Sequence, residues 1–155
     1  MAQNTDNNIL ADNGKAFFDY EILETVSAGI ELLGFEVKSV KARKATLDGS
    51  YVTIRGNEAY LMQMSVPPYQ VSNTPEDYDP LRIRRLLLTK DEIKKLADIE
   101  SGKGLTIVPI RVYTKARRIK VDIAIVRGKK KFDKRQSIKK RETDIEIRRT
   151  LKYEE

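Results

Sequence analysis

Positive charge is concentrated at the carboxyl-terminal end of this chain, and this limits which part of it can form a packed fold. Nine of the fifteen residues from Arg127 to Arg141 are Lys or Arg, and only Asp133 is acidic. Residues 127–155 carry 12 of the 30 basic and 6 of the 23 acidic side chains, a net charge of +6. The first 126 residues are therefore almost neutral, with 18 basic and 17 acidic side chains. This asymmetry predicts a near-neutral globular body and a cationic tail that binds a polyanion.

The residue inventory excludes several classes of chemistry. The chain has no His and no Cys, which rules out cysteine nucleophiles, Ser-His triads and zinc sites. It has no run of about 18 apolar residues, so no transmembrane helix is predicted. Its first residues lack the basic flank and apolar core of a signal peptide, so a cytoplasmic location is expected. Carboxylates such as Glu21, Glu24 and Glu36 leave an enzyme as an alternative, but no phosphate-binding loop or matched acid pair supports it.

The first half of the body is predicted to hold strands, one short helix and a hairpin. Residues 15–33 are expected to form two strands joined by a turn at residues 27–29. The spacing of Val and Lys after Gly34 predicts a short helix with a basic face. The clearest hairpin spans residues 51–64, with Gly56-Asn57 as its two-residue turn.

The second half begins with a long loop and ends in two long strands. Residues 65–80 hold four of the five prolines and show no periodicity, so they are expected to be a functional or mobile loop. Residues 82–88 predict a basic patch that continues into a buried strand. A capping box of Thr89 and Glu92 predicts a helix that ends at Gly102.

Strict alternation of apolar and polar residues marks the final strand of the body. One face is predicted to carry Ile119, Val121, Ile123 and Ile125. In the preceding strand, Val108, Ile110 and Val112 are expected to share a face, and Pro109 predicts an edge or a bulge. With six or seven strands in hairpins and two short helices, we expect a mainly β fold. The best prediction is a closed antiparallel barrel of the oligonucleotide-binding (OB) type, because closure removes exposed strand edges.

Three regions follow from these patterns. Residues 1–13, rich in Asn and Asp, are expected to be a flexible leader, and residues 14–127 an OB-like RNA-binding barrel. Residues 128–155 have too few apolar groups to offset the entropic cost of ordering, so the basic tail is expected to be disordered when free. An aromatic residue among the cations, Phe132, can stack on a base while its neighbours contact phosphates. A latent helix aligns Lys134, Arg141, Arg148 and Lys152, although a solvated charge run is the alternative.

Short motifs along the chain, in order and at matching spacing, resemble the SsrA-binding protein family (small protein B). The resemblance covers about residues 13–152. The matching segments are Lys15-Ala16 with Asp19-Tyr20, Ala28-Gly29-Ile30, Gly34 with Glu36-Val37-Lys38-Ser39, Asp48 with Ser50-Tyr51-Val52, Asp79-Pro80-Leu81-Arg82, Arg84-Arg85-Leu86-Leu87-Leu88, Gly104-Leu105-Thr106 with Val108-Pro109, and Gly128-Lys129-Lys130 with Asp133-Lys134-Arg135.

The resemblance implies a function in ribosome rescue, without catalysis. The body would bind the tRNA-like domain of transfer-messenger RNA and deliver it to stalled ribosomes for trans-translation. Elongation factor Tu, bound to the charged RNA, is implied as a further partner. The tail, helical on the ribosome, would occupy the empty messenger channel and decoding centre. No cofactor, metal or membrane partner is implied.

The same resemblance, read with the residue chemistry, gives two sets of binding residues. Those expected to contact transfer-messenger RNA are Asn13, Lys15, Phe18, Tyr20, Lys38, Ser39, Arg82, Arg84 and Arg85. Those expected to contact ribosomal RNA are Gly128, Lys129, Lys130, Phe132, Asp133, Lys134, Arg135, Lys139, Arg141 and Arg148. The chain departs from the family pattern at several positions, which are Phe18, Ser27, Phe35, Tyr78 and Thr89.

Other readings of the sequence stay open at this point. A general RNA-binding or ribosomal protein could use the same barrel and basic tail. Charged residues at Arg82, Arg84 and Arg85 could instead protect a strand edge from aggregation. An anionic-membrane binder is disfavoured because the apolar groups of the tail are sparse. The loop carboxylates Glu76, Asp77 and Asp79 are expected to be solvated and not to bind a metal.

Overall fold

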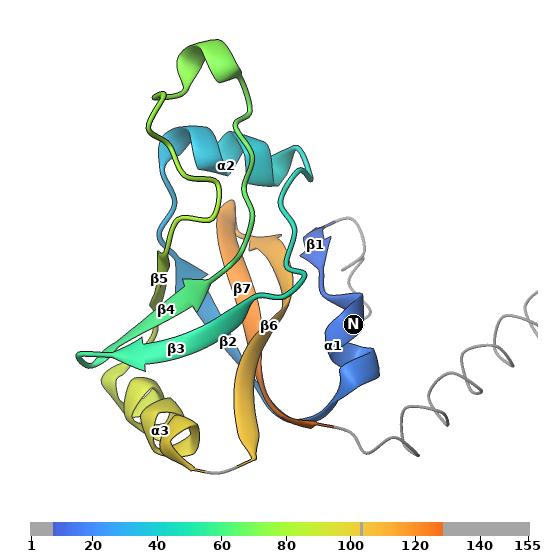
Figure 1. The fold of residues 1–155 in the computed structure, drawn as a ribbon, viewed down its shortest axis with the longest axis vertical. Coiled ribbons are helices and arrows are strands. Elements are labelled where there is room, and N and C mark those ends of the chain that lie inside the picture. The colour runs from blue at the N-terminus through green and yellow to red at the C-terminus, as the bar shows by residue number, and fades with distance from the viewer. Residues whose placement is uncertain (1–7, 103, 129–155) are drawn as a thin grey trace, which may run out of the picture.

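The computed structural model describes residues 8–102 and 104–128, which form a strongly curved antiparallel sheet with helices at its ends and on one side (Figure 1). In chain order the elements are β1 (Ile9–Asp12), α1 (Gly14–Asp19), β2 (Tyr20–Ile30), α2 (Gly34–Lys41), β3 (Tyr51–Arg55), β4 (Glu58–Met62), the 3-10 helix η2 (Val71–Asn73), β5 (Arg84–Leu87), α3 (Lys90–Ser101), β6 (Leu105–Lys115) and β7 (Arg118–Gly128).

One seven-stranded sheet contains all these strands, in the order β1-β6-β7-β2-β5-β4-β3. Every pairing is antiparallel, which confirms a mainly β fold. The predicted closure is wrong: over the described residues the hydrogen-bonded order begins at β1 and ends at β3, although the sheet curls enough to bring β3 close to β6. The sheet is therefore open in its hydrogen bonding.

The main core fills the concave side of the curved sheet. Alternation along β7 places Val121, Ile123 and Ile125 in this core, with Ile119 packed against it, as predicted. The prediction of a shared face for β6 is wrong, because a bulge between Pro109 and Arg111 adds one residue. The bulge shifts the alternation, so Val112 faces the main core while Val108 and Ile110 face the other side.

A second, smaller cluster lies on the convex side of the sheet, under α1. Its buried members are Ala16, Val108, Ile110, Ala124 and Val126. This arrangement corrects the prediction for the amino-terminal region. Residues 9–12, expected in the flexible leader, form β1 and pair with β6, and the segment after them forms α1.

The predicted turn at residues 27–29 is not present. Residues 20–30 form one continuous strand, and Ser27, Ala28 and Gly29 pair with Asp122, Val121 and Lys120 of β7. The register of β2 shifts between Ile22 and Glu24. Long-range pairing with β7 therefore overrides a local composition that resembles a turn.

Two local predictions are confirmed. Gly56 and Asn57 join β3 to β4 with φ angles of 56° and 62°, the left-handed values that a two-residue hairpin turn requires. At α3, the Thr89 hydroxyl accepts a hydrogen bond from the Glu92 N–H at 3.2 Å, and Glu92 Oε1 accepts one from the Thr89 N–H at 3.0 Å. Reciprocal capping of this kind fixes where the helix begins.

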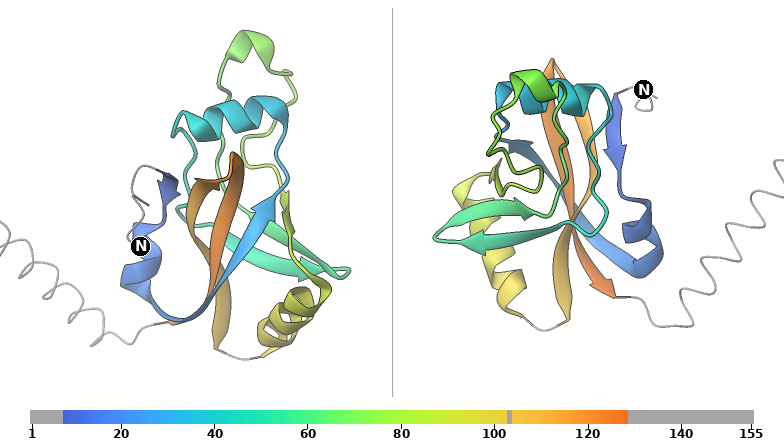
Figure 2. Two further views of the ribbon diagram at one scale, coloured as in Figure 1. Left: turned by 180° about the vertical axis from the view of Figure 1, so that it is seen from behind. Right: turned by 45° about the horizontal axis from the view of Figure 1, so that its top comes forward.

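The helices lie at different places around the sheet. In Figures 1 and 2, α2 and α3 lie at opposite ends of the curved sheet, and the loop that contains η2 extends beyond α2. With α1 the described residues hold three α-helices, one more than predicted. Within the same residues, no helix is long and apolar enough to span a membrane.

Candidate nucleic-acid interface

Four side chains, two of them fully buried, form a cluster that ties α2 to the loop before β5. This Glu36 cluster consists of Glu36, Tyr78, Arg82 and Arg84. The side chains of Glu36 and Arg84 are both 0% exposed, and Arg84 Nη2 and Nε donate to Glu36 Oε2 at 2.6 and 2.9 Å. Arg82 Nη2 donates to the other carboxylate oxygen at 2.5 Å. Both oxygens of the Glu36 carboxylate thus accept hydrogen bonds from arginines, as a buried charge requires.

Backbone groups complete the cluster. The Leu33 N–H donates to Glu36 Oε1 at 2.7 Å, and Arg84 Nη1 donates to the Met64 carbonyl at 2.7 Å. The Tyr78 hydroxyl lies 2.9 Å from Glu36 Oε2 and 2.8 Å from the Val66 carbonyl. These bonds join α2, the end of β4 and the segment before β5 into one unit.

The electrostatics of the cluster keep Glu36 ionised. Burial by itself would raise the pKa of Glu36, but hydrogen bonds from Arg82, the Leu33 N–H and Arg84 outweigh it and lower the pKa to about 2. Burial and the neighbouring Glu36 carboxylate raise the pKa of Tyr78 to about 12. At neutral pH Glu36 therefore has no proton to donate, and with 0% exposure and both oxygens hydrogen-bonded its carboxylate is a structural group in this conformation.

Three of the predicted RNA contacts have structural roles inside the body. Arg84 is fully buried in the Glu36 cluster. Asn13 is 4% exposed, and its Nδ2 donates to the Pro109 carbonyl at 2.8 Å, beside the bulge in β6. Ser39 is buried, and its hydroxyl donates to the Pro67 carbonyl at 2.6 Å. In this conformation none of the three side chains lies on an accessible surface.

The other predicted residues of the body are at least partly accessible, but they lie apart. Lys15 is exposed on α1 and Lys38 on α2, at separate places on the body. Arg85 is exposed on β5, where it pairs with Glu58 at 3.2 Å and Glu31 at 3.7 Å. The half-exposed members of the set are Phe18, Tyr20 and Arg82.

A polar surface on the convex side of the sheet lies beyond the part covered by α1. We call it the outer face; its residues are Ser27, Arg111, Tyr113, Lys120 and Asp122. Strand register brings them together: Asp122 is opposite both Ser27 and Arg111, and Lys120 is opposite Tyr113. Since alternate residues of a strand share a face, Lys120 and Tyr113 lie on the same side of the sheet as Ser27, Asp122 and Arg111.

Hydrogen bonding fixes one member of the outer face. The Tyr113 hydroxyl and the Ser27 hydroxyl are 2.6 Å apart. Burial raises the pKa of Tyr113 above its usual value, and the negative charge of Asp122 adds to this, whereas the Ser27 hydrogen bond opposes it. Tyr113 is therefore neutral at physiological pH and is held at one position on the sheet.

Three depressions adjoin the outer face. The largest, of about 700 Å³, lies between the end of α2, the start of β1 and the turn between β6 and β7. A second, of about 440 Å³, shares Lys41 and Arg117 with it. The third, of about 350 Å³, shares Gly29, Leu87 and Lys120 with the second. Because neighbouring depressions share lining residues, they follow one another along this side of the body, and we call the three together the hollowed band.

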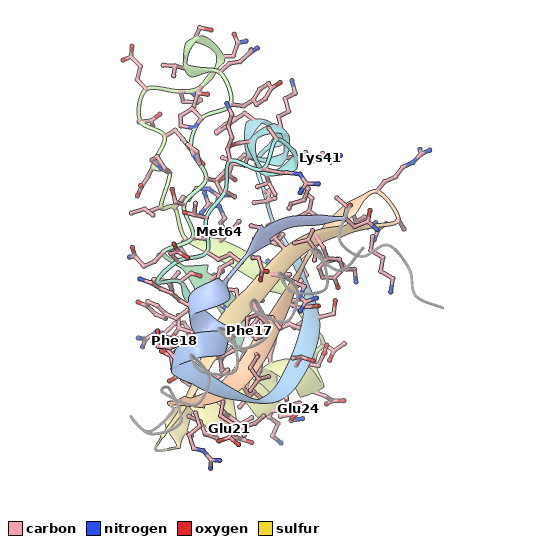
Figure 3. All side chains as sticks on the ribbon, turned by 90° about the vertical axis from the view of Figure 1, so that its right-hand side faces the viewer. Phe17, Phe18, Glu21, Glu24, Lys41 and Met64 are labelled. Carbon is pink, nitrogen blue, oxygen red and sulfur yellow. The ribbon has the colours of Figure 1, made fainter. Side chains whose placement is uncertain are left out.

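Sequence reasoning missed most of the cations around this band. They are Lys41, Arg111, Lys115, Arg117, Arg118 and Lys120. The basic turn at residues 115–118 was a visible signal, since four consecutive residues contain three cations. Its relation to Lys41 was not visible, because these residues are distant in the chain and meet only through the fold. Figure 3 shows Lys41 at the end of α2, next to β1.

Acidic side chains elsewhere are paired or dispersed. Glu21 Oε2 accepts a hydrogen bond from Arg127 Nη2 at 2.7 Å, and Glu24 pairs with Lys95. Figure 3 shows Glu21 and Glu24 on β2 at the end of the sheet away from Lys41. Among the described residues no group of three or more carboxylates could hold a metal ion. In the proline-rich loop, Asp79 Oδ1 accepts from the Leu81 N–H at 2.9 Å, a local turn contact.

Of the predicted ribosome-binding residues, only Gly128 lies among the described residues. Gly128 is the last residue of β7 and is exposed. The others, from Lys129 to Arg148, lie outside the described residues, and the predictions for the tail stay predictions.

Comparison with known proteins gives the family. A family model described as SmpB protein matches residues 10–153. An SsrA-binding protein of Clostridium acetobutylicum is 51% identical over 150 residues, which span 97% of this chain and 96% of the relative. An SsrA-binding protein of Levilactobacillus brevis is 46% identical over 98% of this chain and 96% of its own length.

A solved structure is also similar. A chain of the structure described as "tmRNA-SmpB: a journey to the center of the bacterial ribosome" is 39% identical and superimposes with a TM-score of 0.65. The match covers 82% of this chain and 92% of that chain. With a full-length family match and close relatives over nearly its whole length, this chain belongs to the SmpB protein family.

Proposed function

We propose that this protein binds the tRNA-like domain of transfer-messenger RNA and delivers it to stalled ribosomes for trans-translation. The observation that carries the proposal is membership of the SmpB family over residues 10–153. The relatives are SsrA-binding proteins by name, and the similar solved structure is described as tmRNA-SmpB in the bacterial ribosome. The protein acts as an RNA-binding partner and catalyses no reaction.

The charge and shape of the described body support this proposal. The hollowed band beside the outer face is lined by cations from α2 and from the β6–β7 turn. Cationic side chains supply most of the affinity for an RNA backbone, whereas shape and unpaired bases supply selectivity for a folded RNA. We propose that the tRNA-like domain contacts this band and, at separate places on the body, Lys38 and Lys15. The curved sheet would then serve as a variant of the OB-type barrel.

The second half of the proposal concerns the carboxyl-terminal tail. Residues 129–155 would be disordered in the free protein and become helical in the empty messenger channel and decoding centre of the ribosome. Elongation factor Tu would accompany the charged RNA, and the complex would act in the cytoplasm. The support is the charge pattern of the sequence together with the family.

Selective RNA binding tests the proposal. Fluorescence anisotropy with labelled transfer-messenger RNA and with bulk tRNA, at a fixed salt concentration, should show clear preference for the former. Equal affinities would favour a general RNA-binding protein. A reconstituted tagging assay tests the tail: Lys134→Ala with Arg135→Ala should preserve RNA affinity and abolish tagging of stalled proteins. A parallel loss of RNA affinity would contradict this division between body and tail.

A further inference from the structure

The depression between α2, β1 and the β6–β7 turn has the dimensions of a small-ligand site. Its volume is about 700 Å³, within the range of about 300–1,000 Å³ typical of ligand pockets. Its walls come from three separate parts of the fold, namely α2, the start of β1 and the β6–β7 turn. It is too small for a helical segment of RNA, but it can hold one nucleotide.

The charge of this depression favours an anion. Four cations line it, Lys41, Arg111, Lys115 and Arg117, against a single carboxylate, Asp122. Two of them come from the turn, where Ala116 and Arg117 have φ angles of 50° and 66°. A left-handed pair of this kind makes the turn tight, so its cations stay close to the depression. A phosphate group fits this arrangement.

One polar atom at this site has no partner. Arg111 Nε is buried and has no hydrogen bond among the described residues, and its distance to Asp122 Oδ2 is 3.8 Å, too long for one. Buried donors are nearly always satisfied in native proteins, so an orphaned one needs an explanation. Since Arg111 also lines the depression, a ligand that brings an acceptor would supply the missing bond.

An aromatic wall completes the site. Tyr113 lines the depression, and its hydroxyl is held by Ser27 at 2.6 Å. An aromatic ring fixed in position offers a stacking surface to a base at little entropic cost. Carboxylate side chains or a lipid headgroup would use the cations, but neither group supplies a flat ring to place against Tyr113. The combination of ring, cations and orphaned donor is typical of nucleotide recognition.

We infer that this depression binds a single unpaired nucleotide that projects from the folded RNA. Its base would stack on Tyr113 with its edge toward Arg111 and Asp122, and its phosphates would contact Lys41 and Arg117. The inference rests on the proposed function for the identity of the RNA. It adds to the general basic surface a subsite that recognises one unpaired nucleotide, whichever base that nucleotide carries.

Nuclear magnetic resonance of the full chain tests the site directly. The ¹⁵N-labelled protein is titrated with AMP, CMP and GMP, and in parallel with ribose 5-phosphate, inorganic phosphate and a poly-glutamate peptide. We expect saturable shifts of amides in residues 111–117 with the nucleotides, and several-fold weaker responses to the base-free anions. If ribose 5-phosphate shifts these amides as strongly as the nucleotides do, the depression binds anions without recognising a base. If the peptide shifts them as strongly, a protein partner is indicated. Either outcome, or no saturable shift, overturns the inference.

Variants of one residue separate stacking from charge. Tyr113→Leu should weaken binding of the nucleotides and of transfer-messenger RNA by about tenfold, as expected when an aromatic partner of a base is removed. Tyr113→Phe, which keeps the ring and loses the bond to Ser27, should retain most of the affinity. Tyr69→Leu is the matched control, because Tyr69 is an exposed tyrosine below Lys44 and lies outside the depression. The ¹⁵N spectrum of each variant reports whether it is folded.

These measurements distinguish failure of the site from failure of the proposed function. If wild-type protein shows no preference for transfer-messenger RNA, yet AMP shifts residues 111–117, the proposed function fails and the nucleotide site stands. If wild-type protein binds transfer-messenger RNA but Tyr113→Leu binds it equally well, the site is not used and the inference is wrong.

Discussion

Replacing Glu36 with Gln tests the central energetic feature of the structure. The substitution keeps the size of the side chain and removes its charge, so Arg84 is left as an unpaired cation with 0% exposure. Removing one partner of a buried ion pair costs about 3–5 kcal/mol. We therefore expect Glu36→Gln to lower the free energy of unfolding at pH 7 by about 3–5 kcal/mol.

The pH dependence gives an independent estimate of the same interaction. The pKa of Glu36 is lowered from 4.5 to about 2 in the folded protein. At 1.36 kcal/mol per pKa unit, this difference is worth about 3 kcal/mol of stability. Because the folded-state pKa is below the unfolded value, the contribution is complete above pH 4.5 and is lost as the pH falls toward 2.

Urea unfolding at a series of pH values from 7 to 2 measures both the loss of unfolding free energy and its dependence on pH. Far-ultraviolet circular dichroism follows the unfolding. Circular dichroism suits this chain because it contains no Trp. The difference in stability between wild type and Glu36→Gln should shrink by about 3 kcal/mol across the window from pH 4.5 to 2. Other carboxylates titrate in both proteins, so their effect cancels in the difference.

The matched control is Glu21→Gln. Glu21 also accepts a hydrogen bond from an arginine, Arg127, but both side chains are more than half exposed. Exposed ion pairs contribute about 0–1 kcal/mol, so this variant should be close to wild type. If Glu36→Gln lies within 1 kcal/mol of wild type at pH 7, or its difference from wild type does not change with pH, the argument for a buried ion cluster is refuted.

Three further predictions follow from the described contacts. Tyr78→Phe removes a hydroxyl that is within bonding distance of Glu36 and Val66, and should lower the unfolding free energy by about 1–3 kcal/mol in urea titrations. Thr89→Ala removes the N-cap of α3 and should cost about 1 kcal/mol; an unchanged urea midpoint would contradict the capping argument. Lys41→Ala should weaken binding of transfer-messenger RNA and reduce the salt dependence of binding, whereas Lys94→Ala on α3 should change neither.

Local sequence patterns predicted the elements whose determinants are local. The hairpin of β3 and β4 was predictable because Gly56-Asn57 accepts the left-handed conformation of its turn. The start of α3 was predictable because Thr89 and Glu92 cap each other's backbone within one turn of helix. Alternation identified the core face of β7, since Val121, Ile123 and Ile125 on one side of that strand are all buried.

The misplaced elements depend on pairing between distant strands. β1 contains only four residues and is stabilised by β6, about a hundred residues later. Ser27 to Gly29 have a composition typical of a turn, but β7 supplies backbone partners that keep them extended. The bulge near Pro109 reverses the alternation within β6. Counting alternating residues cannot reveal this reversal, because it depends on how β6 pairs with β7.

By itself the sequence determined the family, the near-neutral body, the cationic tail and the strands that follow a strict local period. Only the tertiary structure decided that Arg84 lies inside the body with Glu36, and that Lys41, Arg111, Tyr113 and Arg117 share one depression. The physical reason is that charge and periodicity are properties of a segment. Burial of a charged group and convergence of side chains depend instead on which distant segments the fold packs together, so the same arginine is a surface contact in one context and a buried partner in another.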